Sequence, residues 1–349
     1  MMEIFLTLFF ITILLFFLGT GIWVAISMIG VSALGMMIFT SRPVGDAMAT
    51  TIWGTSSSWT LTALPLFVWM GEILFRTKLS ENLFEGLSPW MQKLPGGLIH
   101  VNVVGCALFA AISGSSAATV ATVGKMSIPE LRKRKYPEKI LLGSLAGSGT
   151  LGLLIPPSII LIIYGVTTQE SIAKLFIAGI LPGIMMALIF MSYVIIWSLI
   201  NKKEMPISYE NFSFLEKIKK SKQLLPVIIL ILAVIGSIYT GIATATEAAS
   251  LGVVGALVLS FFQKSLNMET FKSSLMGATK TSCMIAFILA GSTFLSLAMG
   301  FTGLPRNLAM WIQNMNLSPY VLIFVLMIFY IILGMFLDGI SAVVLTMAI

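Results

Sequence analysis

The sequence contains little charge, one histidine and two cysteines. Only 10% of its 349 residues are Asp, Glu, Lys or Arg, whereas 58% are hydrophobic and the mean hydropathy is +1.01. No soluble globular class has this composition, so the chain is predicted to be an all-α membrane protein with several spans. His100, Cys106 and Cys283 form no metal-binding cluster in the sequence. The sequence also has no phosphate-binding loop and no nucleophile elbow, and these absences argue against an enzyme.

Long apolar runs, in contrast, recur along the whole chain. A helix needs about 20 apolar residues to cross a bilayer. Two further segments, 78–95 and 302–316, mix charged residues with helix-spaced apolar ones, and they are predicted to lie flat on the membrane surface. The predicted spans are 4–18, 22–40, 59–76, 140–165, 171–200, 224–241, 244–262, 275–298 and 318–336.

The positive charges gather in two loops, at 132–139 and 202–222. The positive-inside rule places both loops in the cytoplasm, and two predicted crossings separate them. Counted backwards, the N-terminus is then outside, and only Arg42, Lys174 and Arg306 of the 21 Lys and Arg residues lie on the outer side. Because membrane topology accounts for the basic runs, they do not indicate a nucleic-acid partner. We expect a multi-pass protein of the bacterial inner membrane.

The region 98–128 is apolar except at a short polar tip, residues 112–117 (Ile-Ser-Gly-Ser-Ser-Ala). Each apolar arm has about 14 residues, too few to cross a bilayer. Two half-length arms joined by a Ser/Gly tip predict a re-entrant helical hairpin. A second tip, 337–342 (Leu-Asp-Gly-Ile-Ser-Ala), follows at an offset of 225 residues.

Similar offsets relate other segments of the two halves. The runs 19–22 and 239–242 share Thr-Gly-Ile, and 77–83 resembles 302–308. We therefore predict an inverted repeat, as found in secondary transporters. Its parts are a first repeat at 1–202, a basic cytoplasmic linker at 203–223 and an incomplete second repeat at 224–349, whose hairpin begins within 318–349. The complete second repeat is expected to extend to about residue 427, past a counterpart of the first repeat's break near 380.

That break lies inside the predicted span 140–165, where Gly152 is followed by Pro156-Pro157. Neither proline can continue a helix, because each lacks an N–H group. The freed carbonyls, together with the hydroxyls of the tips, suit a hard monovalent cation such as Na⁺. Half-helix N-termini at the same places suit an anion, so the pattern predicts Na⁺-coupled uptake of a carboxylate. The alternative is that Ser and Gly only allow close packing of helices.

Two carboxylates lie in apolar surroundings. Asp338, in the second tip, is predicted to act on the cation or the substrate, since an unpaired carboxylate in a membrane is costly. The alternative is an interfacial or salt-bridged residue. Glu247 lies nearer the end of a span, and for it a substrate contact and a snorkelling or helix-capping role remain equally open.

Four segments together resemble the large membrane subunit of tripartite ATP-independent periplasmic (TRAP) transporters. They are residues 111–117, 152–157, 245–249 and 334–338. The resemblance covers essentially the whole chain. It implies an elevator mechanism, a small four-helix membrane subunit and a periplasmic substrate-binding protein as partners, and an organic acid such as a C4-dicarboxylate or a sialic acid as the substrate imported with Na⁺.

The resemblance also implies where the ions and the substrate bind. The first Na⁺ site falls on Ser113 and Ser115 with backbone oxygens of Gly152, Ile155 and Pro157, and the second on Asp338, Gly339 and Ser341. Substrate contacts are predicted at Ser115, Ser116, Thr246 and Glu247. The rival hypotheses are a two-hairpin dicarboxylate carrier that needs no binding protein and, less favoured, a polytopic membrane enzyme.

Overall fold

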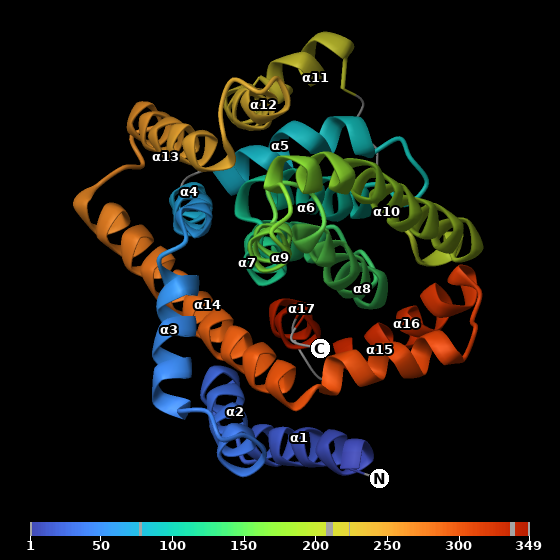
Figure 1. Cartoon of the computed structure of the whole chain (residues 1–349). Helices are drawn as coiled ribbons and strands as arrows, with labels where there is room; N and C mark the ends of the chain where they lie inside the picture. Colours follow the sequence, from blue (N-terminus) through green and yellow to red (C-terminus); the bar gives the residue numbers. More distant parts are fainter. Residues whose placement is uncertain (1, 77–78, 207–211, 223, 336–338, 348–349) are drawn as a thin grey trace. The chain divides into compact units, whose positions relative to one another are not determined.

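A computed structural model describes residues 2–76, 79–206, 212–222, 224–335 and 339–347 (Figure 1). Within these ranges the chain forms helices and no strand, which confirms the all-helical prediction for the described part. The helices of the first half are α1 (Met2–Gly19), α2 (Val24–Phe39), α3 (Val44–Ser56), η1 (Trp59–Thr62), α4 (Ala63–Phe75), α5 (Leu79–Met91), α6 (Ile99–Ser113), α7 (Ser116–Lys133), α8 (Glu138–Gly149), η2 (Thr150–Leu153), α9 (Ile159–Thr168) and α10 (Ile172–Ile200). Those that follow are η3 (Lys202–Glu204), α11 (Phe214–Ser221), α12 (Leu225–Tyr239), α13 (Ala245–Phe262), α14 (Met268–Thr302), α15 (Leu304–Asn314), α16 (Pro319–Gly334) and α17 (Gly339–Thr346).

Few of these helices are long enough to cross a bilayer unbroken. By length and composition, α10, α13 and α14 qualify in the described chain, and two bent pairs raise the number to five. One pair is α3 with Trp59–Phe75, and the other is α11 with α12. Further apolar helices, including α2, α6, α9 and α16, have only 10 to 17 residues. The apolar, all-helical chain agrees with a polytopic membrane protein, although many of its predicted spans are short helices.

Helix α3 has no counterpart among the predicted spans. It covers Val44–Ser56, a stretch for which the sequence predicted no helix. None of its side chains is buried, and Trp53 is 75% exposed. The face that α3 packs against the core is half-buried and mixes Val44, Ala47 and Met48 with Thr51 and Thr55, so the apolar pattern from which a packed helix is recognised is weak.

The chain divides into two compact units. One unit comprises residues 62–165 and 170–281, which include α4 to α8 and α10 to α13. The other comprises residues 1–61, 166–169 and 282–349, which include α1 to α3 and α15 to α17. Helix α14 contributes its first part to the former and its second part to the latter.

In the unit that holds residues 62–165 and 170–281, α4 packs closely against both α6 and α13. A Cβ added at Gly71 would lie 3.0 Å from Cα of Ser113, and one added at Gly252 would lie 2.5 Å from Sδ of Met70. Small residues therefore allow α4 to approach its neighbours more closely than a side chain would, as is common where membrane helices pack.

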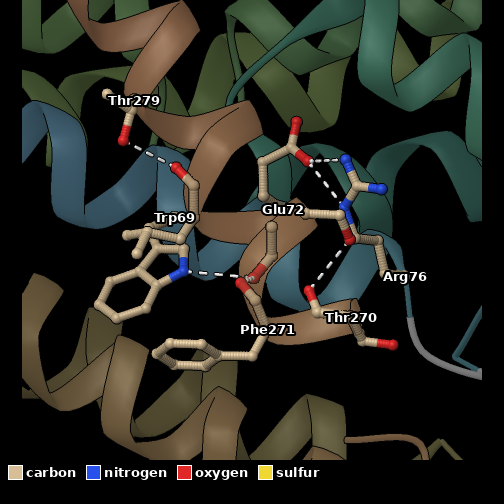
Figure 2. Close-up of polar contacts among 9 residues, drawn as sticks. Trp69, Glu72, Arg76, Thr270, Phe271 and Thr279 are labelled. Carbon is tan, nitrogen blue, oxygen red and sulfur yellow. Dashed lines mark hydrogen bonds and ion pairs between the residues drawn. The ribbon is translucent and has the colours of Figure 1, made fainter. Parts of the chain in front are cut away.

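The first part of α14 also packs against α4 (Figure 2). Trp69 of α4 donates from Nε1 to Oγ of Ser274 over 3.4 Å, and its ring meets that of Phe271 edge-on at 5.8 Å. The carboxylate of Glu72 lies against Gly277, where an added Cβ would be 2.7 Å from Oε2. Glu72 is also paired with Arg76, the C-cap of α4, at 3.0 Å, so these two charges neutralise each other one turn apart.

The other unit has a core of its own, formed by α1, α2, α15 and the second part of α14. Gly291 of α14 approaches α2, since an added Cβ would lie 2.8 Å from the carbonyl oxygen of Ala25. Ser292, on the same helix, donates to the carbonyl oxygen of Val344 in α17. The buried apolar core residues are Leu6, Phe10, Met28, Val31, Leu295, Met299 and Leu304.

Candidate functional site

Helices α6 and α7 form a hairpin whose turn consists of Gly114 and Ser115. Gly114 has φ +58°, a left-handed conformation in which glycine is favoured because it has no Cβ. Ser115 is the N-cap of α7, and its Oγ accepts a hydrogen bond from the Ala118 N–H over 3.5 Å. Serine is favoured at an N-cap because its hydroxyl satisfies one of the free N–H groups of the first turn. The polar tip predicted from the sequence is therefore a Gly–Ser turn between two helices.

Hydroxyl groups gather at this turn. Oγ of Ser113 lies 2.9 Å from Oγ1 of Thr119, and Thr119 also donates to the carbonyl oxygen of Ser115 over 2.7 Å. Ser113 donates to the same carbonyl oxygen over 3.3 Å. Ser113 is 7% exposed and Thr119 is completely buried. The tip thus holds two hydroxyls and a carbonyl oxygen within hydrogen-bond distance of one another.

The break after α8 meets the hairpin turn through its backbone. The N–H of Ile159 donates to the carbonyl oxygen of Gly114 over 3.3 Å. A Cβ added at Gly114 would lie 2.8 Å from the carbonyl oxygen of Pro157, and one added at Gly152 would lie 2.7 Å from that of Ser115. Only glycine allows such an approach, so both glycines are required for contact between the tip and the break.

The shape of the break follows from its two prolines. Helix α8 ends at Gly149, a 3₁₀ turn covers Thr150–Leu153, and α9 starts at Ile159. In a continuous helix the carbonyl of Gly152 would accept from residue 156, but Pro156 has no N–H. Ser158, which is fully buried, donates from Oγ to the carbonyl oxygen of Leu153 and so occupies the neighbouring carbonyl.

Helix α10 packs against the break. A Cβ added at Gly179 would lie 3.0 Å from the carbonyl oxygen of Leu154, and one added at Gly183 would lie 2.8 Å from Cγ1 of Ile155. The Ile155 N–H donates to the carbonyl oxygen of Leu151 over 2.9 Å. The break is therefore a fixed loop between the hairpin turn and α10.

Of the five residues predicted for the first cation site, Ser113, Ser115 and Gly152 meet around the Ser115 carbonyl, and Pro157 lies against the adjacent Gly114. Ile155 lies in the same loop, with its side chain against α10. All the oxygens they offer are neutral hydroxyl or carbonyl oxygens, which suit a singly charged hard cation. Among the residues described, no three His, Cys, Asp or Glu side chains form a group able to hold a metal.

The same turn presents the N-terminus of α7. Ser116 is the first residue of α7, and Ser115 and Ser116 are both partly exposed. The free N–H groups and the positive end of the helix dipole favour a negative group at this place. The two serines predicted to contact the substrate therefore lie where a carboxylate would be stabilised.

The second predicted cation site is only partly within the described chain. Asp338 lies outside the described residues, whereas Gly339 and Ser341 are in α17, where Ser341 is 2% exposed. Helix α17 is held by Ser292, as given above, and by Tyr330 of α16, which donates to Oγ1 of Thr346 over 2.9 Å. Gly339 and Ser341 therefore belong to a helix that these two hydrogen bonds attach to α14 and α16.

Thr246 and Glu247 are at the start of α13. Oε2 of Glu247 accepts from the N–H and the hydroxyl of Thr244, each over 2.8 Å, and the Glu247 N–H donates back to Oγ1 of Thr244. This reciprocal pattern is a capping box, which stabilises a helix N-terminus. Of the two roles left open by the sequence, these contacts favour helix capping, and no contact of Glu247 with the hairpin turn is among those described.

Three residues of the site are absent from the sequence prediction. Thr119 and Ser158 contribute hydroxyls, and Gly71 lets α4 approach the end of α6. Thr119 lies one helical turn after Ser115, a spacing that the sequence does display. Gly71 carries no such signal, because its importance depends on a contact with Ser113, 42 residues later in the chain.

Comparison with known proteins places these features in a family context. Residues 11–349 match the family model described as the DctM component of the tripartite ATP-independent periplasmic transporter. A C4-dicarboxylate TRAP transporter large permease protein from Pseudomonas aeruginosa is 33% identical over 317 residues, which are 90% of this chain and 73% of that protein. A sialic acid TRAP transporter large permease protein from Vibrio cholerae is 30% identical over 94% of this chain and 76% of its own length. An isethionate TRAP transporter permease protein from Oleidesulfovibrio alaskensis is 29% identical over 94% of this chain and 51% of its own length.

Proposed function

Because the chain belongs to the family of TRAP transporter large permeases, we propose that it is the membrane permease of a Na⁺-coupled importer of an organic acid. Its relatives are named for C4-dicarboxylates and for sialic acid, both of which carry carboxylate groups. The observation that carries the proposal is the meeting of the hairpin turn with the helix break. There, neutral oxygens and the N-terminus of a helix provide for a cation and an anion side by side.

The first Na⁺ site in this proposal uses the hydroxyls of Ser113 and Ser115 and the backbone oxygens of Gly152, Ile155 and Pro157. The contacts that support it are those of Gly152 with the Ser115 carbonyl and of Pro157 with Gly114. Thr119 fixes the orientation of the Ser115 carbonyl from the side of α7. Na⁺ is here a transported co-substrate that binds and leaves in each cycle.

The second Na⁺ site would be formed by Asp338, Gly339 and Ser341. It is supported by the recurrence of the tip sequence and by the burial of Ser341 in α17. A carboxylate among apolar residues is costly unless a cation or another partner compensates it. In this proposal the charge of Asp338 is compensated by Na⁺ binding.

The substrate carboxylate would bind at Ser115 and Ser116, close to the first Na⁺. Thr246 is proposed as a further contact, and Glu247 would act beside it through the capped start of α13. A negatively charged substrate and a cation bound next to each other attract, and this attraction makes the binding of one dependent on the other.

Transport would proceed by an elevator movement in an inverted-repeat fold. The offset of 225 residues between the tips supports the repeat, and paired discontinuous segments are the usual place of the binding site in such transporters. A periplasmic substrate-binding protein would deliver the acid, and a small four-helix membrane subunit would complete the permease. The protein would lie in the bacterial inner membrane with its N-terminus outside.

The proposal is tested by uptake into proteoliposomes. The full-length permease is reconstituted with its small subunit and binding protein, and labelled C4-dicarboxylates and sialic acid are offered with and without an inward Na⁺ gradient. Uptake that requires both the gradient and the binding protein is expected. Na⁺-driven uptake without the binding protein would favour the two-hairpin carrier instead, and uptake independent of Na⁺ would refute the coupling.

The same assay tests the second site through Asp338→Asn. Loss of the carboxylate is expected to weaken the dependence of uptake on Na⁺. Asp46→Asn, at an exposed carboxylate in the first turn of α3, is the matched control and is expected to leave the Na⁺ curve unchanged.

A further inference from the structure

A cavity of about 550 Å³ lies between α5, α7 and α11, in the unit that contains residues 62–165 and 170–281. It is separate from the hairpin turn, because the α7 residues that line it lie at least nine positions after Ser116, the first residue of that helix. Its charged and aromatic lining consists of Phe84, Glu85, Lys125, Glu130, Arg134, Phe212 and Lys220. The proposed transport function uses none of these residues.

The wall formed by α11 is firmly attached to α5. Trp90 donates from Nε1 to Oγ of Ser221 over 2.7 Å, and Ser221 in turn donates to the carbonyl oxygen of Gly86 over 3.3 Å. The ring of Trp90 meets that of Phe214 edge-on at 6.3 Å, and Nζ of Lys217 lies 5.3 Å from the centre of the Trp90 ring. The cavity is therefore bounded by specific contacts between these two helices.

Three cations and two carboxylates line the cavity, so its lining is positive overall. Glu130 is paired with Arg134 at 3.7 Å. Lys220 lies with Nζ 4.2 Å from the centre of the Phe212 ring, and Lys125 is exposed at the cavity. Glu85 is the remaining carboxylate. The neighbouring loops and helices carry further lysines, Lys133, Lys135, Lys217, Lys219 and Lys222, whereas Arg132 is paired with Glu138.

Helix α11 also presents apolar side chains to the outside. Leu215 is 76% exposed, Phe214 is 66% exposed and Ile218 is 48% exposed. A short helix that exposes both large apolar side chains and lysines is suited to the boundary between lipid tails and headgroups. The cavity therefore opens beside a helix whose composition matches the membrane surface.

From these observations we propose that the cavity between α5, α7 and α11 binds the headgroup of an anionic phospholipid. Lys125 and Lys220 would contact the phosphodiester, and Leu215 and Ile218 would lie among the upper acyl chains. The basic loops face the negatively charged cytoplasmic leaflet in the topology proposed above, and basic pockets on that side of a membrane protein attract acidic lipids. The bound lipid would reinforce the attachment of α11 to α5 at the membrane surface.

Native mass spectrometry of the detergent-purified permease complex tests this proposal. Phosphatidylglycerol and phosphatidylcholine are titrated into wild type, Lys125→Gln/Lys220→Gln and Lys139→Gln/Lys280→Gln. The control pair removes the same charge from two exposed lysines that do not line the cavity. Retention of phosphatidylglycerol should fall about fivefold per lysine lost, roughly 25-fold for the cavity pair, and remain unchanged in the control.

The other outcomes are equally informative. Equal loss of retention in both double variants, or equal retention of phosphatidylcholine and phosphatidylglycerol by wild type, would overturn the proposal. Competition by inorganic phosphate at the same concentration as the lipid would show an anion site that does not need a lipid. Raising the ionic strength should weaken retention in wild type, since the lysines are exposed to solvent. Because uptake is not the readout, failure here leaves the proposed transport function untouched.

Discussion

Gly152 lies against the carbonyl oxygen of Ser115 so closely that a Cβ at position 152 would be 2.7 Å from it. This contact joins the helix break to the hairpin turn. Replacing this glycine, as in Gly152→Ala, would force the two backbones apart and lower the stability of the folded protein by about 1–3 kcal/mol. If these oxygens bind Na⁺ together, the Na⁺ concentration for half-maximal uptake should rise about tenfold, the equivalent of 1.4 kcal/mol.

Gly143→Ala is the control for this variant. Gly143 is on the exposed side of α8, and no atom of another element lies within 4 Å of the position of its Cβ. Alanine should there stabilise the helix slightly and leave the Na⁺ curve unchanged. An unchanged Na⁺ curve in Gly152→Ala, with the protein still folded, would show that the contact serves packing alone.

The hairpin turn and the break could be predicted because their signals are local. A Gly between two serines in an apolar run indicates a turn, and two successive prolines exclude a continuous helix whatever surrounds them. The close approach of Gly152 to Ser115 could not be derived from residue patterns, because it depends on how segments 37 residues apart fold together. Only the resemblance to a family placed these residues in one site.

Other features depended on packing and on side-chain hydrogen bonds, which a sequence displays only indirectly. Helix α3 escaped prediction because its packed face is only half-buried and includes threonines. For Glu247 the sequence left two roles open, although Thr244 three residues before it has the spacing of a capping box, and the hydrogen bonds with Thr244 favour capping. Asp338 lies outside the described residues, so its role remains a prediction from the sequence.

Thr119→Val should change Na⁺ binding with little change in shape, since valine has the same outline as threonine. The substitution removes the hydroxyl that donates to the Ser115 carbonyl and whose oxygen lies 2.9 Å from Oγ of Ser113. A hydrogen bond inside a membrane protein contributes about 0.6 kcal/mol on average, so the Na⁺ concentration for half-maximal uptake should rise about threefold. Thr122→Val removes a similar bond, to the carbonyl of Ala118, one turn further along α7, and is expected to have no such effect. Equal Na⁺ curves in both variants would remove Thr119 from the proposed site.

Thr244→Ala tests the capping role at the start of α13. It removes the hydroxyl of the capping box but keeps the Glu247 side chain, whose Oε2 still accepts from the Thr244 N–H. The loss of an N-cap costs about 0.5–2 kcal/mol. The melting temperature should therefore fall, as it should in Glu247→Gln, while Thr279→Ala at an exposed helix position should change it little. A raised KM for the organic acid in Glu247→Gln, but not in Thr244→Ala, would instead support a direct contact of Glu247 with the substrate.

Tyr136→Phe should destabilise the base of the hairpin. The Leu98 N–H, which is buried, donates to the hydroxyl of Tyr136 over 3.1 Å, and phenylalanine would leave that N–H without an acceptor. An unsatisfied buried group costs about 1–3 kcal/mol, so thermal unfolding of the purified protein should begin at a lower temperature. Tyr193→Phe, at a side chain that is 57% exposed, is the control.

Tyr136→Phe should also change how the thermal stability of the protein depends on pH. Burial raises the pKa of Tyr136 above its ordinary value of 10.0, because the ionised phenolate is disfavoured away from water. A group whose pKa is raised on folding stabilises the folded state at pH values below its pKa in the unfolded chain. This contribution is lost as the pH rises through its pKa in the folded protein. Wild type should therefore lose stability above pH 10.0 more steeply than Tyr136→Phe, as measured by thermal unfolding from pH 8 to 11. Parallel curves for the two proteins would show that the Tyr136 hydroxyl is not buried in solution.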